Sequence, residues 1–597
     1  MNIKQESIRD STSTLSASAV DQPLNSKVSS NSSSGRMPEY SYEKNTPRSM
    51  PKRLWNSFKP AKEHDFDTTG MTDAEIQNAR MANAPMEEGL GEIQISLIAI
   101  GGSIGSGLFI GTGNDLAAAG PGGVIVGFCI VGVMLFFMMH SLGEVSVRWP
   151  KLSMAMHTHR LVDDSLAFSM SWIYFLNWLV SFPLELVASA ITIQYWSSTA
   201  AQANPAGWVA LFWVVLSVIG FCPVRTYGYS ECVFSIIKII TILGFCIFGI
   251  CAAAGANPKQ HYFGTHYWHD PGSFTDAKSV ITALVNVSFA LSGIELVGMT
   301  SAEARNPAVS LPRAVKQTFW RVIIFYIVSL TICFCLVPYT NEKLGTHDDG
   351  SASPFVLAID NAGVKGLPSV VNVVILLAAL SVGNAAIFGS SRTLAAIAHS
   401  GGAPKFFGYV DRAGRPLVAI ACTVGFGLIG FIVAAPKYQE AFDWLQAISA
   451  QATMFVWAFI SYSHIMMRLA MHKQGRSLKE QYYTSPYGIP GSIIAFVITV
   501  TILCLEFWTT IWPKGTVTTA YDFFVTWVSL PIAIALYVVH KLIYRRRPLT
   551  PSKIDLITEA RIKTQREIDE QDRLDAEYKA NKPAFVRVVL KTVNLFF

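Results

Sequence analysis

Charged residues are scarce in this sequence. Of its 597 residues, 47 are Lys or Arg and 41 are Asp or Glu, and together they make 15% of the chain. Because a soluble globular domain carries about 25% charged residues, this chain has too few charges to coat several water-exposed domains. With 51% apolar residues and a mean hydropathy of +0.36, the sequence predicts that much of the chain faces lipid. The same composition excludes a disordered or collagen-like protein.

Motifs of enzymes, metal sites and nucleic-acid binding are missing as well. The nine cysteines include no C-x-x-C pair and lie mostly in apolar runs, so we interpret them as buried thiols. His140 and His464 are isolated and fit no metal-ligand spacing. No Walker or H-E-x-x-H motif is present, and the G-x-S-x-G match at 101–105 (GGSIG) lies inside an apolar run rather than at the strand-to-helix turn that a nucleophilic serine needs. Both observations argue against an enzyme and against a cofactor. A net charge of only +6, with no basic run interleaved with surface aromatics, argues against nucleic acid as a partner.

Long apolar runs recur from Ile93 onward, and runs of about 20 residues can cross the hydrocarbon core of a bilayer. The predicted fold class is therefore all-α, a polytopic membrane protein with twelve transmembrane helices. We place these spans at 94–114, 122–146, 167–196, 207–222, 229–252, 278–300, 319–340, 368–392, 416–435, 443–467, 490–511 and 521–543.

The two ends of the chain have a different composition from the spans. Residues 1–92 are rich in serine and have no apolar period, which predicts a disordered cytosolic regulatory tail. Residues 93–545 are predicted to form the transmembrane domain, and residues 546–597 a cytosolic C-terminal tail. The charged, periodic part of this second tail favours a solvated helix, and Phe585–Phe597 is an apolar segment that could touch the membrane. A frayed tail is the alternative.

Loop charge predicts the orientation of the spans. Lys and Arg are retained on the cytoplasmic side of a membrane. The loops after even-numbered spans carry most of them, including Arg148, Arg313, Arg321 and Arg412, whereas the loops after odd-numbered spans hold only a few lysines. Both termini are therefore predicted to be cytosolic, and the basic run 545–547 after the last span supports the same orientation.

The first span contains a run of small residues, G-G-S-I-G-S-G at 101–107, and glycine and serine hold a helix together poorly. Unwound backbone at membrane depth is tolerated only where it lines a cavity or is buried in protein. Half-helices meeting at such a break would direct N–H groups at a carboxylate, and a nearby free carbonyl could accept from an ammonium, which fits an α-amino acid. Close helix packing through small residues is the alternative. The candidate substrate-binding residues here are Ser103, Ile104, Gly105, Ser106 and Gly107.

A second break is predicted in the sixth span, where residues 289–295 read F-A-L-S-G-I-E. It lies five spans after the first break, as expected if helices 1–5 and 6–10 form inverted repeats and helices 11 and 12 are appended. Interruptions at corresponding positions of two halves are the best sequence indicator of a binding site at the membrane midplane. Phe289, Ala290, Ser292 and Gly293 are the candidate substrate-binding residues at this break.

Few ionisable residues lie well inside the spans, and each is costly in lipid. Lys238 lies in the middle of the fifth span, where desolvation penalises its charged form, and we predict that it carries a proton. Permanent pairing with Glu231 or with carbonyls is the alternative. Glu185 follows Pro183 and could take up a proton, pair with Lys238 or contact a cationic ligand. The other acids inside the spans are Glu144, Glu295, which is a third proton-coupling candidate, and Glu506, to which we assign a structural role.

Two further polar residues are candidate selectors in a pocket. Asn177 lies about two helical turns before Glu185, on a similar face of the third span, and Ser449 lies in the tenth span. A satisfied hydrogen bond between helices is the commoner role for such residues.

Several segments are similar to the signatures of one family. Residues 101–111 (GGSIGSGLFIG) and the stretches 119–150, 182–196, 292–307, 367–384 and 411–420 resemble fungal amino-acid permeases of the amino acid–polyamine–organocation superfamily. The resemblance covers about residues 94–545 and is stronger to the general amino-acid permeases than to narrow arginine or lysine carriers. It implies a five-plus-five inverted-repeat fold of the LeuT type with two extra helices, and proton symport of amino acids at the plasma membrane, with the proton as coupling ion and no cofactor.

The resemblance also implies roles for the candidate residues. The segments 103–107 and 290–293 would hold the substrate carboxylate and ammonium, and Lys238 resembles the lysine that bacterial relatives use for proton coupling. Glu185 is similar to a glutamate of the fungal pattern. The pair Asn177 and Ser449 resembles the residues found at these two positions in lysine carriers, so transport of cationic substrates is an open alternative.

The N-terminal tail departs from the family pattern, because relatives usually carry a basic cluster before the first span where residues 87–92 here read E-E-G-L-G-E. The tail lysines Lys4, Lys27 and Lys44 are candidates for recognition by a ubiquitin ligase or adaptor, as in relatives, with cycling through the ER, Golgi and endosomes. A passive tether is the alternative.

Residues and resemblance together predict a proton-coupled symporter that imports L-amino acids with broad specificity. Its expected partners are the amino-acid substrate and membrane lipid. The alternatives are a non-transporting amino-acid sensor of the same fold and a narrow lysine or arginine permease.

Overall fold

The computed structural model describes residues 59–60, 89–152, 154–196, 204–344, 353–435, 438–513, 518–545 and 547–581. Most of the predicted N-terminal tail, including Lys4, Lys27 and Lys44, and the apolar segment Phe585–Phe597 lie outside these residues. Within them the β-structure is limited to two isolated bridges, Pro60 with Asp411 and Leu90 with Ala304. All other regular structure in the described part is helical.

The helices match the predicted spans in position. Eight continuous helical segments of the described chain are long and apolar enough to cross a membrane. They are η1 with α4 (Gly107–Arg148), α6 with η2 (Asp164–Trp196), α9 (Val224–Ala253), α13 with η4 and α14 (Pro307–Phe334), α16 (Leu367–His399), α17 with η7 (Leu417–Ala434), most of α18 (Tyr438–Lys473) and α19 (Gly488–Ile511). A ninth candidate is α20 (Ala520–Trp527) with α21 (Ser529–Tyr544), which are bent by 67°.

Three shorter apolar helices account for the remaining predicted spans: α3 (Glu92–Gly101), α8 (Pro205–Gly220) and α11 (Ala277–Ala290). The other helices are short or polar: α5 (Met154–Leu161), α10 (His266–His269), α12 (Leu296–Thr300), α15 (Pro354–Ala362) and α22 (Gln565–Asn581). The prediction of an all-α polytopic membrane protein is confirmed. The number twelve stays a prediction, because three of the expected spans coincide with helices shorter than a full crossing.

Local sequence explains where several helices begin. The Asp163 carboxylate accepts a hydrogen bond from the Leu166 N–H at the start of α6, and Asn204 accepts from Ala206 before Pro205 opens α8. Asp276 accepts from the N–H groups of Lys278 and Ser279 at the start of α11. These caps satisfy N–H groups that have no partner inside the helix.

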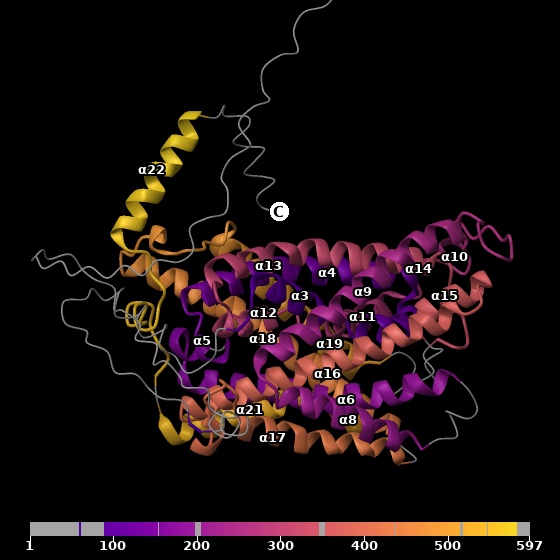
Figure 1. Ribbon diagram of the computed structural model, residues 1–597, viewed down its shortest axis with the longest axis horizontal. Coiled ribbons are helices and arrows are strands. Elements are labelled where there is room, and N and C mark those ends of the chain that lie inside the picture. The colour runs from indigo at the N-terminus through magenta and orange to yellow at the C-terminus, as the bar shows by residue number, and fades with distance from the viewer. Residues whose placement is uncertain are drawn as a thin grey trace, which may run out of the picture. The chain divides into compact units, whose positions relative to one another are not determined.

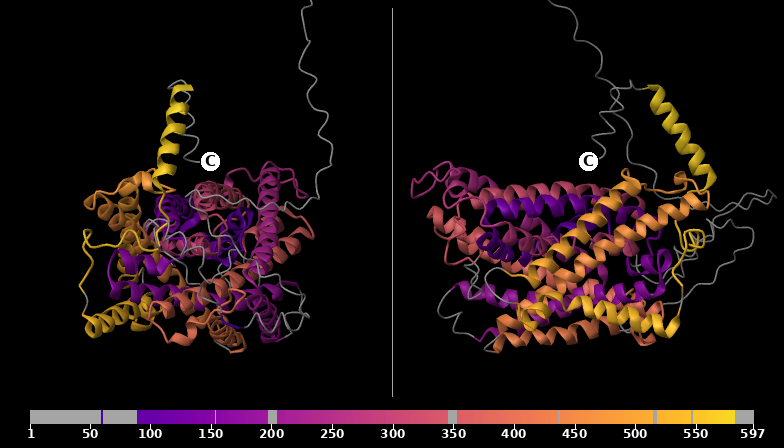
Figure 2. Two further views of the ribbon diagram at one scale, coloured as in Figure 1. Left: turned by 60° about the vertical axis from the view of Figure 1, so that its left-hand side comes forward. Right: turned by 180° about the vertical axis from the view of Figure 1, so that it is seen from behind.

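The long helices run alongside one another, with α6 packed against α16, α18 and α21, and α11 against α4 and α19 (Figures 1 and 2). In the most apolar window of α6 83% of the residues are buried, but in those of α9 and α19 only 33% are. The exposed residues of α9 are apolar, among them Ile240, Ile247 and Ile250. Such an apolar exposed face is what a lipid-facing helix requires, so α6 is central and α9 and α19 are peripheral.

Both predicted breaks are present. The helix α3 ends at Gly101 and helical structure resumes as η1 (Gly107–Gly111), while α11 ends at Ala290 and α12 begins at Leu296. Gly293 lies in the left-handed region with φ +91°, and a Cβ on it would collide with the Gly102 carbonyl oxygen. The two breaks therefore pack backbone against backbone, and glycine is required at this contact.

Part of the predicted C-terminal tail is docked on the helices. The Leu549 N–H donates to the Val162 carbonyl (2.9 Å), the Lys563 N–H donates to the Glu480 carbonyl (2.9 Å), and Arg148 donates to the Leu556 carbonyl (2.8 Å). Ile554, Leu556, Ala560 and Ile562 are buried. The segment 549–563 is thus part of the folded body, and the charged stretch after it forms α22.

Candidate functional site

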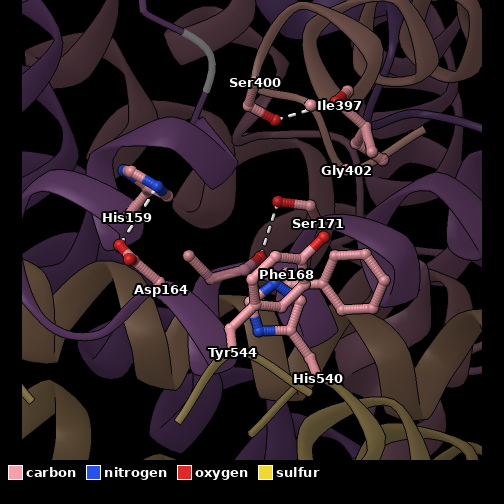
Figure 3. Close-up of a pocket in the computed structure, with 11 residues that line it drawn as sticks. His159, Asp164, Phe168, Ser171, Ile397, Ser400, Gly402, His540 and Tyr544 are labelled. Atoms are coloured by element: carbon pink, nitrogen blue, oxygen red, sulfur yellow. Dashed lines mark hydrogen bonds and ion pairs between the residues drawn. The ribbon is translucent and has the colours of Figure 1, made fainter. Parts of the chain in front are cut away.

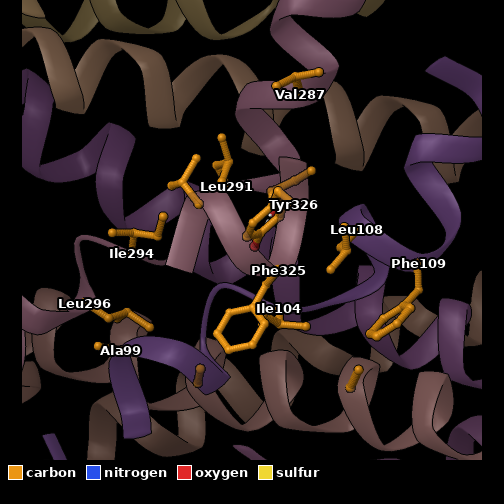
Figure 4. Close-up of a cluster of buried hydrophobic side chains, with 14 of the residues drawn as sticks. Ala99, Ile104, Leu108, Phe109, Val287, Leu291, Ile294, Leu296, Phe325 and Tyr326 are labelled. Atoms are coloured by element: carbon orange, nitrogen blue, oxygen red, sulfur yellow. Dashed lines mark hydrogen bonds between the residues drawn. The ribbon is translucent and has the colours of Figure 1, made fainter. Parts of the chain in front are cut away.

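The two breaks are joined by a tyrosine from a third helix. Tyr326, in η4 (Val322–Val328), is buried, and its hydroxyl lies 2.7 Å from the Ser103 carbonyl oxygen and 3.1 Å from that of Ala290. Figure 4 shows its ring among the side chains of Leu291, Ile104 and Leu108, which flank the breaks. The contact is long-range, so sequence reasoning missed Tyr326.

The first break leaves backbone donors unused. The Gly102 and Ile104 N–H groups donate to carbonyls of α3, but the N–H groups of Ser103 and Gly105 donate to no acceptor among the described residues. A Cβ on Gly107 would lie 2.7 Å from the Ala290 Cα, so no larger residue fits there. The break therefore combines open donors with close backbone approach, as an anion-binding segment requires.

A small cavity lies where the breaks meet α6, α16 and α18. Its lining includes many of the candidate residues: Ser103, Gly105, Gly107, Phe289, Ala290, Ser292, Ser449 and Glu185. Gly102, Trp178, Ser181 and Val382 also line it and were not predicted. Its volume is about 20 Å³, which is space for about one water molecule. The cavity is thus too small for an amino acid, and binding requires a rearrangement of its walls.

Four predicted binding residues lie next to the cavity without lining it. Ile104 is fully buried in the apolar core, and Gly293 packs on Gly102. Ser106 donates a 2.7 Å hydrogen bond to Glu185 Oε1. Asn177 Oδ1 accepts a 2.6 Å hydrogen bond from the Ser449 hydroxyl. These residues support the lining rather than form it.

Glu185 connects the first break to the central helix α6. Its Oε1 accepts from Ser106, and its Oε2 has no hydrogen-bond partner among the described residues, although the side chain is buried. A buried polar atom without a partner is costly unless a ligand, water or proton satisfies it. Glu185 is therefore the acid placed to respond to what enters the cavity.

Lys238 holds the end of the first half-helix. Its buried ammonium lies 2.7 Å from the carbonyl oxygen of Gly101, the last residue of α3, and among the described residues it forms no ion pair. Glu231, the alternative partner, instead accepts from Ser381 (2.7 Å) and from Asn384 (2.8 Å) of α16. Of the arrangements left open by the sequence, the structure shows the contact with a carbonyl.

A second cation caps the same helix end. Arg321 is buried and donates to the Ala99 carbonyl and to the Thr318 hydroxyl. A cation near a helix C-terminus offsets its partial negative charge. The loop cations of the predicted orientation include Arg321, although it falls at the start of the predicted span 319–340, and the structure places it at the end of the helix α13, which begins at Pro307. The Asn-Pro pair at 306–307 was the available signal, since proline is common at the first position of a helix.

The polar residues of α6 and α18 form a small network. The Ser449 hydroxyl lies 3.1 Å from the Ser181 hydroxyl, and the Thr453 hydroxyl donates to the Ser449 carbonyl (2.9 Å). Ser292 at the second break lies 3.0 Å from the Thr453 hydroxyl. The Asn177 amide nitrogen has no partner among the described residues, so this network leaves an amide donor unused.

Glu295 lies behind the second break. Its Oε2 accepts from the Gly293 N–H (3.1 Å) and from the Trp457 indole (3.2 Å), while its Oε1 has no partner among the described residues. It does not line the cavity, and its bond to Gly293 fixes the backbone of the break. Of the three predicted proton-coupling residues, only Glu185 reaches the cavity.

Glu144 belongs to a separate buried cluster. It accepts from Arg468 (2.7 Å) and from the Ser485 N–H (2.7 Å), and it lies 3.0 Å from His464 Nε2. His464, which fits no metal-ligand spacing in the sequence, is thus placed against an acid of another helix. The described residues contain no group of three or more His, Cys, Asp or Glu side chains placed to hold a metal ion.

Another pocket, of about 270 Å³, lies between α5, α6, the end of α16 and α21. Figure 3 shows its polar groups in mutual contact: His159 lies 3.1 Å from Asp164, and the His540 ring stacks on Phe168. His540 also lies 3.0 Å from the Ser165 hydroxyl. It contains none of the predicted site residues, and its Ser171 and Ser400 hydroxyls donate to the backbone carbonyls of Ala167 and Ile397.

Comparison with known proteins adds independent evidence. Residues 94–552 match the family model described as "Amino acid permease". The chain is 44% identical over 478 residues to the general amino-acid permease GAP2 of Candida albicans, covering 79% of this chain and 81% of the relative. It is 41% identical over 501 residues to the general amino-acid permease GAP1 of Saccharomyces cerevisiae, covering 82% of each. The S-adenosylmethionine permease GAP4 of Candida albicans is 41% identical over 498 residues, 83% of this chain and 81% of that protein. The resemblance inferred from the signature segments is confirmed, and the chain belongs to the amino-acid permease family.

Proposed function

We propose that this chain is a proton-coupled symporter that imports L-amino acids with broad specificity across the plasma membrane, with both termini in the cytosol. Residues 93–545 are the permease domain, helices 1–5 and 6–10 its inverted repeats, and the flanking residues its cytosolic tails. Family membership supports amino-acid transport. The observation that carries the mechanism is the meeting of two broken helices at a cavity, with Lys238 holding the end of one of them.

The breaks supply complementary groups for an α-amino acid. The open N–H groups of Ser103 and Gly105 would receive the carboxylate, at the start of the helical segment that continues into α4. Carbonyls at the second break, where α11 ends at Ala290, would receive the ammonium. Because the cavity is too small for an amino acid in this structure, binding has to separate the breaks from α6 or from α18.

The proton acts through Lys238 and Glu185. A protonated Lys238 ties the end of α3 to α9, and loss of the proton weakens this tie, so α3 can move. Glu185 lies between Ser106 and the cavity and couples the same half-helix to α6. Protonation from outside and substrate binding would together close the outer side, and release of both would follow on the inside.

The proton gradient is large enough for this task. One charge descending 100 mV supplies about 2.3 kcal/mol, and each pH unit supplies about 1.4 kcal/mol. With one proton per neutral substrate, a difference of about 100 mV and about 2 pH units yields about 5 kcal/mol. At about 1.4 kcal/mol per tenfold, the accumulation reaches three to four decades.

Uptake of a labelled amino acid, competed by all twenty amino acids over a range of external pH, tests the proposal. It is measured in cells that express the full chain and lack their own amino-acid permeases. We expect accumulation that rises with external acidity, collapses with a protonophore and is competed by many amino acids. Binding without accumulation would instead identify a sensor, and accumulation insensitive to the protonophore would exclude proton coupling.

A narrow carrier of cationic substrates is the second candidate. The Ser449–Asn177 hydrogen bond of 2.6 Å places a polar pair beside the cavity, and one relative is named an S-adenosylmethionine permease. Competition only by lysine, arginine and S-adenosylmethionine would favour it.

The serines and lysines of the N-terminal tail are proposed to serve a ubiquitin ligase or adaptor that returns the protein to endosomes.

A further inference from the structure

A much larger cavity lies at one end of the helices. It has a volume of about 930 Å³ and is bounded by parts of α4, α11, α18, α19 and α20. This volume is in the range of sites that enclose small organic ligands. Most of the residues that line it are polar, and they include Asn114 and Asn286. Side chains of this kind at the ends of membrane helices line water rather than lipid, so the cavity is expected to be hydrated.

The charges in this cavity are predominantly negative. Three acids line it, Asp443 of α18, Glu506 of α19 and Asp522 of α20, against a single lysine among the described residues, Lys278. The Lys278 ammonium lies 5.2 Å from the centre of the Trp508 ring, which holds it by a cation–π contact. We call this feature the acidic cavity.

Glu506 is the residue that indicates a ligand. It is only 6% exposed, it lines the acidic cavity, and its carboxyl group interacts with the Gln451 side chain, while its Oε2 has no hydrogen-bond partner among the described residues. A buried carboxylate oxygen without a partner is unfavourable, and a cation or donor arriving from the cavity would satisfy it. The structural role that the sequence predicts for Glu506 does not account for an oxygen left unpaired beside a cavity of this size.

The acidic cavity leads toward the small cavity at the breaks. Val285 and Ala450 line the acidic cavity, whereas Phe289 and Ser449 line the small one. Val285 and Phe289 are one turn apart on α11, and Ala450 follows Ser449 on α18. The basic residues of α4 and α18, Arg148 and Arg468, lie toward the other ends of these helices, so by the distribution of positive charge the acidic cavity opens to the outside.

We propose that the acidic cavity is a second, outward-facing binding site for organic cations, and that it captures the ammonium or guanidinium side chain of basic amino acids before they reach the breaks. This inference rests on the proposed transport function. Negative walls raise the local concentration of a cationic substrate and its rate of encounter. Neutral amino acids gain nothing from these walls, so the acidic cavity selects between substrates that the breaks hold in the same way.

Initial uptake rates of labelled lysine and labelled leucine test this site in whole cells. For Glu506→Gln we expect the KM for lysine to rise about three- to tenfold, while the KM for leucine stays unchanged. Glu506→Asp, which keeps the charge, is the matched control, and its lysine KM should stay close to the wild-type value. Lys278→Gln removes the opposing cation, and it should lower the lysine KM.

Several outcomes would overturn the acidic cavity as a cation site. They are an unchanged lysine KM in Glu506→Gln, or equal rises for lysine and leucine. If Glu506→Gln does not reach the cell surface, Asp522→Asn and Lys278→Gln replace it in the test. We expect Asp522→Asn to raise the lysine KM and Lys278→Gln to lower it, with the leucine KM unchanged in both.

A direct binding measurement separates this inference from the proposed function. Cadaverine, a diamine without a carboxylate, should bind the purified full chain and lose affinity about three- to tenfold in Glu506→Gln. If the wild type accumulates neither lysine nor leucine, the transport proposal fails and the cadaverine result alone decides the cation site. Equal cadaverine affinity for wild type and Glu506→Gln would refute the cation site even if transport is shown.

Discussion

The ammonium of Lys238 lies 2.7 Å from the carbonyl oxygen of Gly101, so a side chain from the middle of α9 holds the last residue of α3. This is the point where the first half-helix stops. Movement of α3 relative to α9 has to break or carry this bond, which places the proposed proton carrier on a joint between two helices.

Replacing Lys238 by Ala removes this joint and the proposed proton carrier together. We expect accumulation driven by external acidity to be lost, whereas exchange of labelled for unlabelled amino acid persists. The measurement is uptake and exchange at several pH values. Ser235→Ala is a suitable control, because Ser235 donates to the Leu97 carbonyl on the same pair of helices and its hydroxyl does not ionise. Full pH-dependent accumulation in Lys238→Ala would show that the lysine is not the carrier.

Glu185→Gln keeps a hydrogen-bond acceptor for Ser106 but cannot ionise. If Glu185 changes its protonation during transport, the pH dependence of uptake should flatten and the maximal rate should fall by at least about tenfold, as for loss of an acid–base group. Surface expression and KM are measured alongside. Unchanged uptake of every amino acid would identify this carboxyl group as purely structural.

Gly293→Ala tests the contact between the two breaks. A Cβ at this position would collide with the Gly102 carbonyl, and φ is +91°, so we expect transport to be lost and thermal stability to fall. Strain of this kind costs about 1–3 kcal/mol. Gly244→Ala in α9 has open space around the added Cβ and is the control. Wild-type uptake by Gly293→Ala would mean that the breaks do not meet in this way.

Tyr326→Phe deletes the hydroxyl that joins the Ser103 and Ala290 carbonyls. Leaving buried acceptors without a donor costs about 1–3 kcal/mol. We therefore expect the KM to rise by the same factor for all amino acids, with no change in which substrates are preferred. Tyr229→Phe on the exposed face of α9 should have no effect. A change confined to one substrate class would instead place Tyr326 in selectivity.

Arg321→Gln removes the second cation from the end of α3. Loss of charged hydrogen bonds of this kind costs about 1.5–3 kcal/mol, so thermal unfolding of the purified full chain should begin at a lower temperature. Lys316→Gln, one turn earlier on α13, is the control and should have a much smaller effect. Equal melting of Arg321→Gln and wild type would show that the buried guanidinium contributes little to stability.

The sequence allowed the helices, both breaks and most cavity-lining residues to be predicted, because these features depend on local composition. The run 101–107 is made mostly of glycine and serine, which are weak helix formers wherever they are placed, and Ser292 and Gly293 interrupt the sixth span in the same way. The roles of Tyr326 and Arg321 could not be predicted in this way, since each depends on a partner more than 200 residues away along the chain. The same holds for His464, whose contact with Glu144 exists only after α4 and α18 pack together.

The docked segment 549–563 has a mechanical consequence. Its hydrogen bonds with Val162, Glu480 and Arg148 connect the ends of three segments of the helix bundle to one another. A transport cycle that moves these three ends apart must break the hydrogen bonds of segment 549–563. A cycle that tilts the three ends together as a rigid body can keep all of these bonds. The docked segment 549–563 therefore favours a cycle in which this end of the molecule moves as a rigid body, while the half-helices at the breaks change their positions.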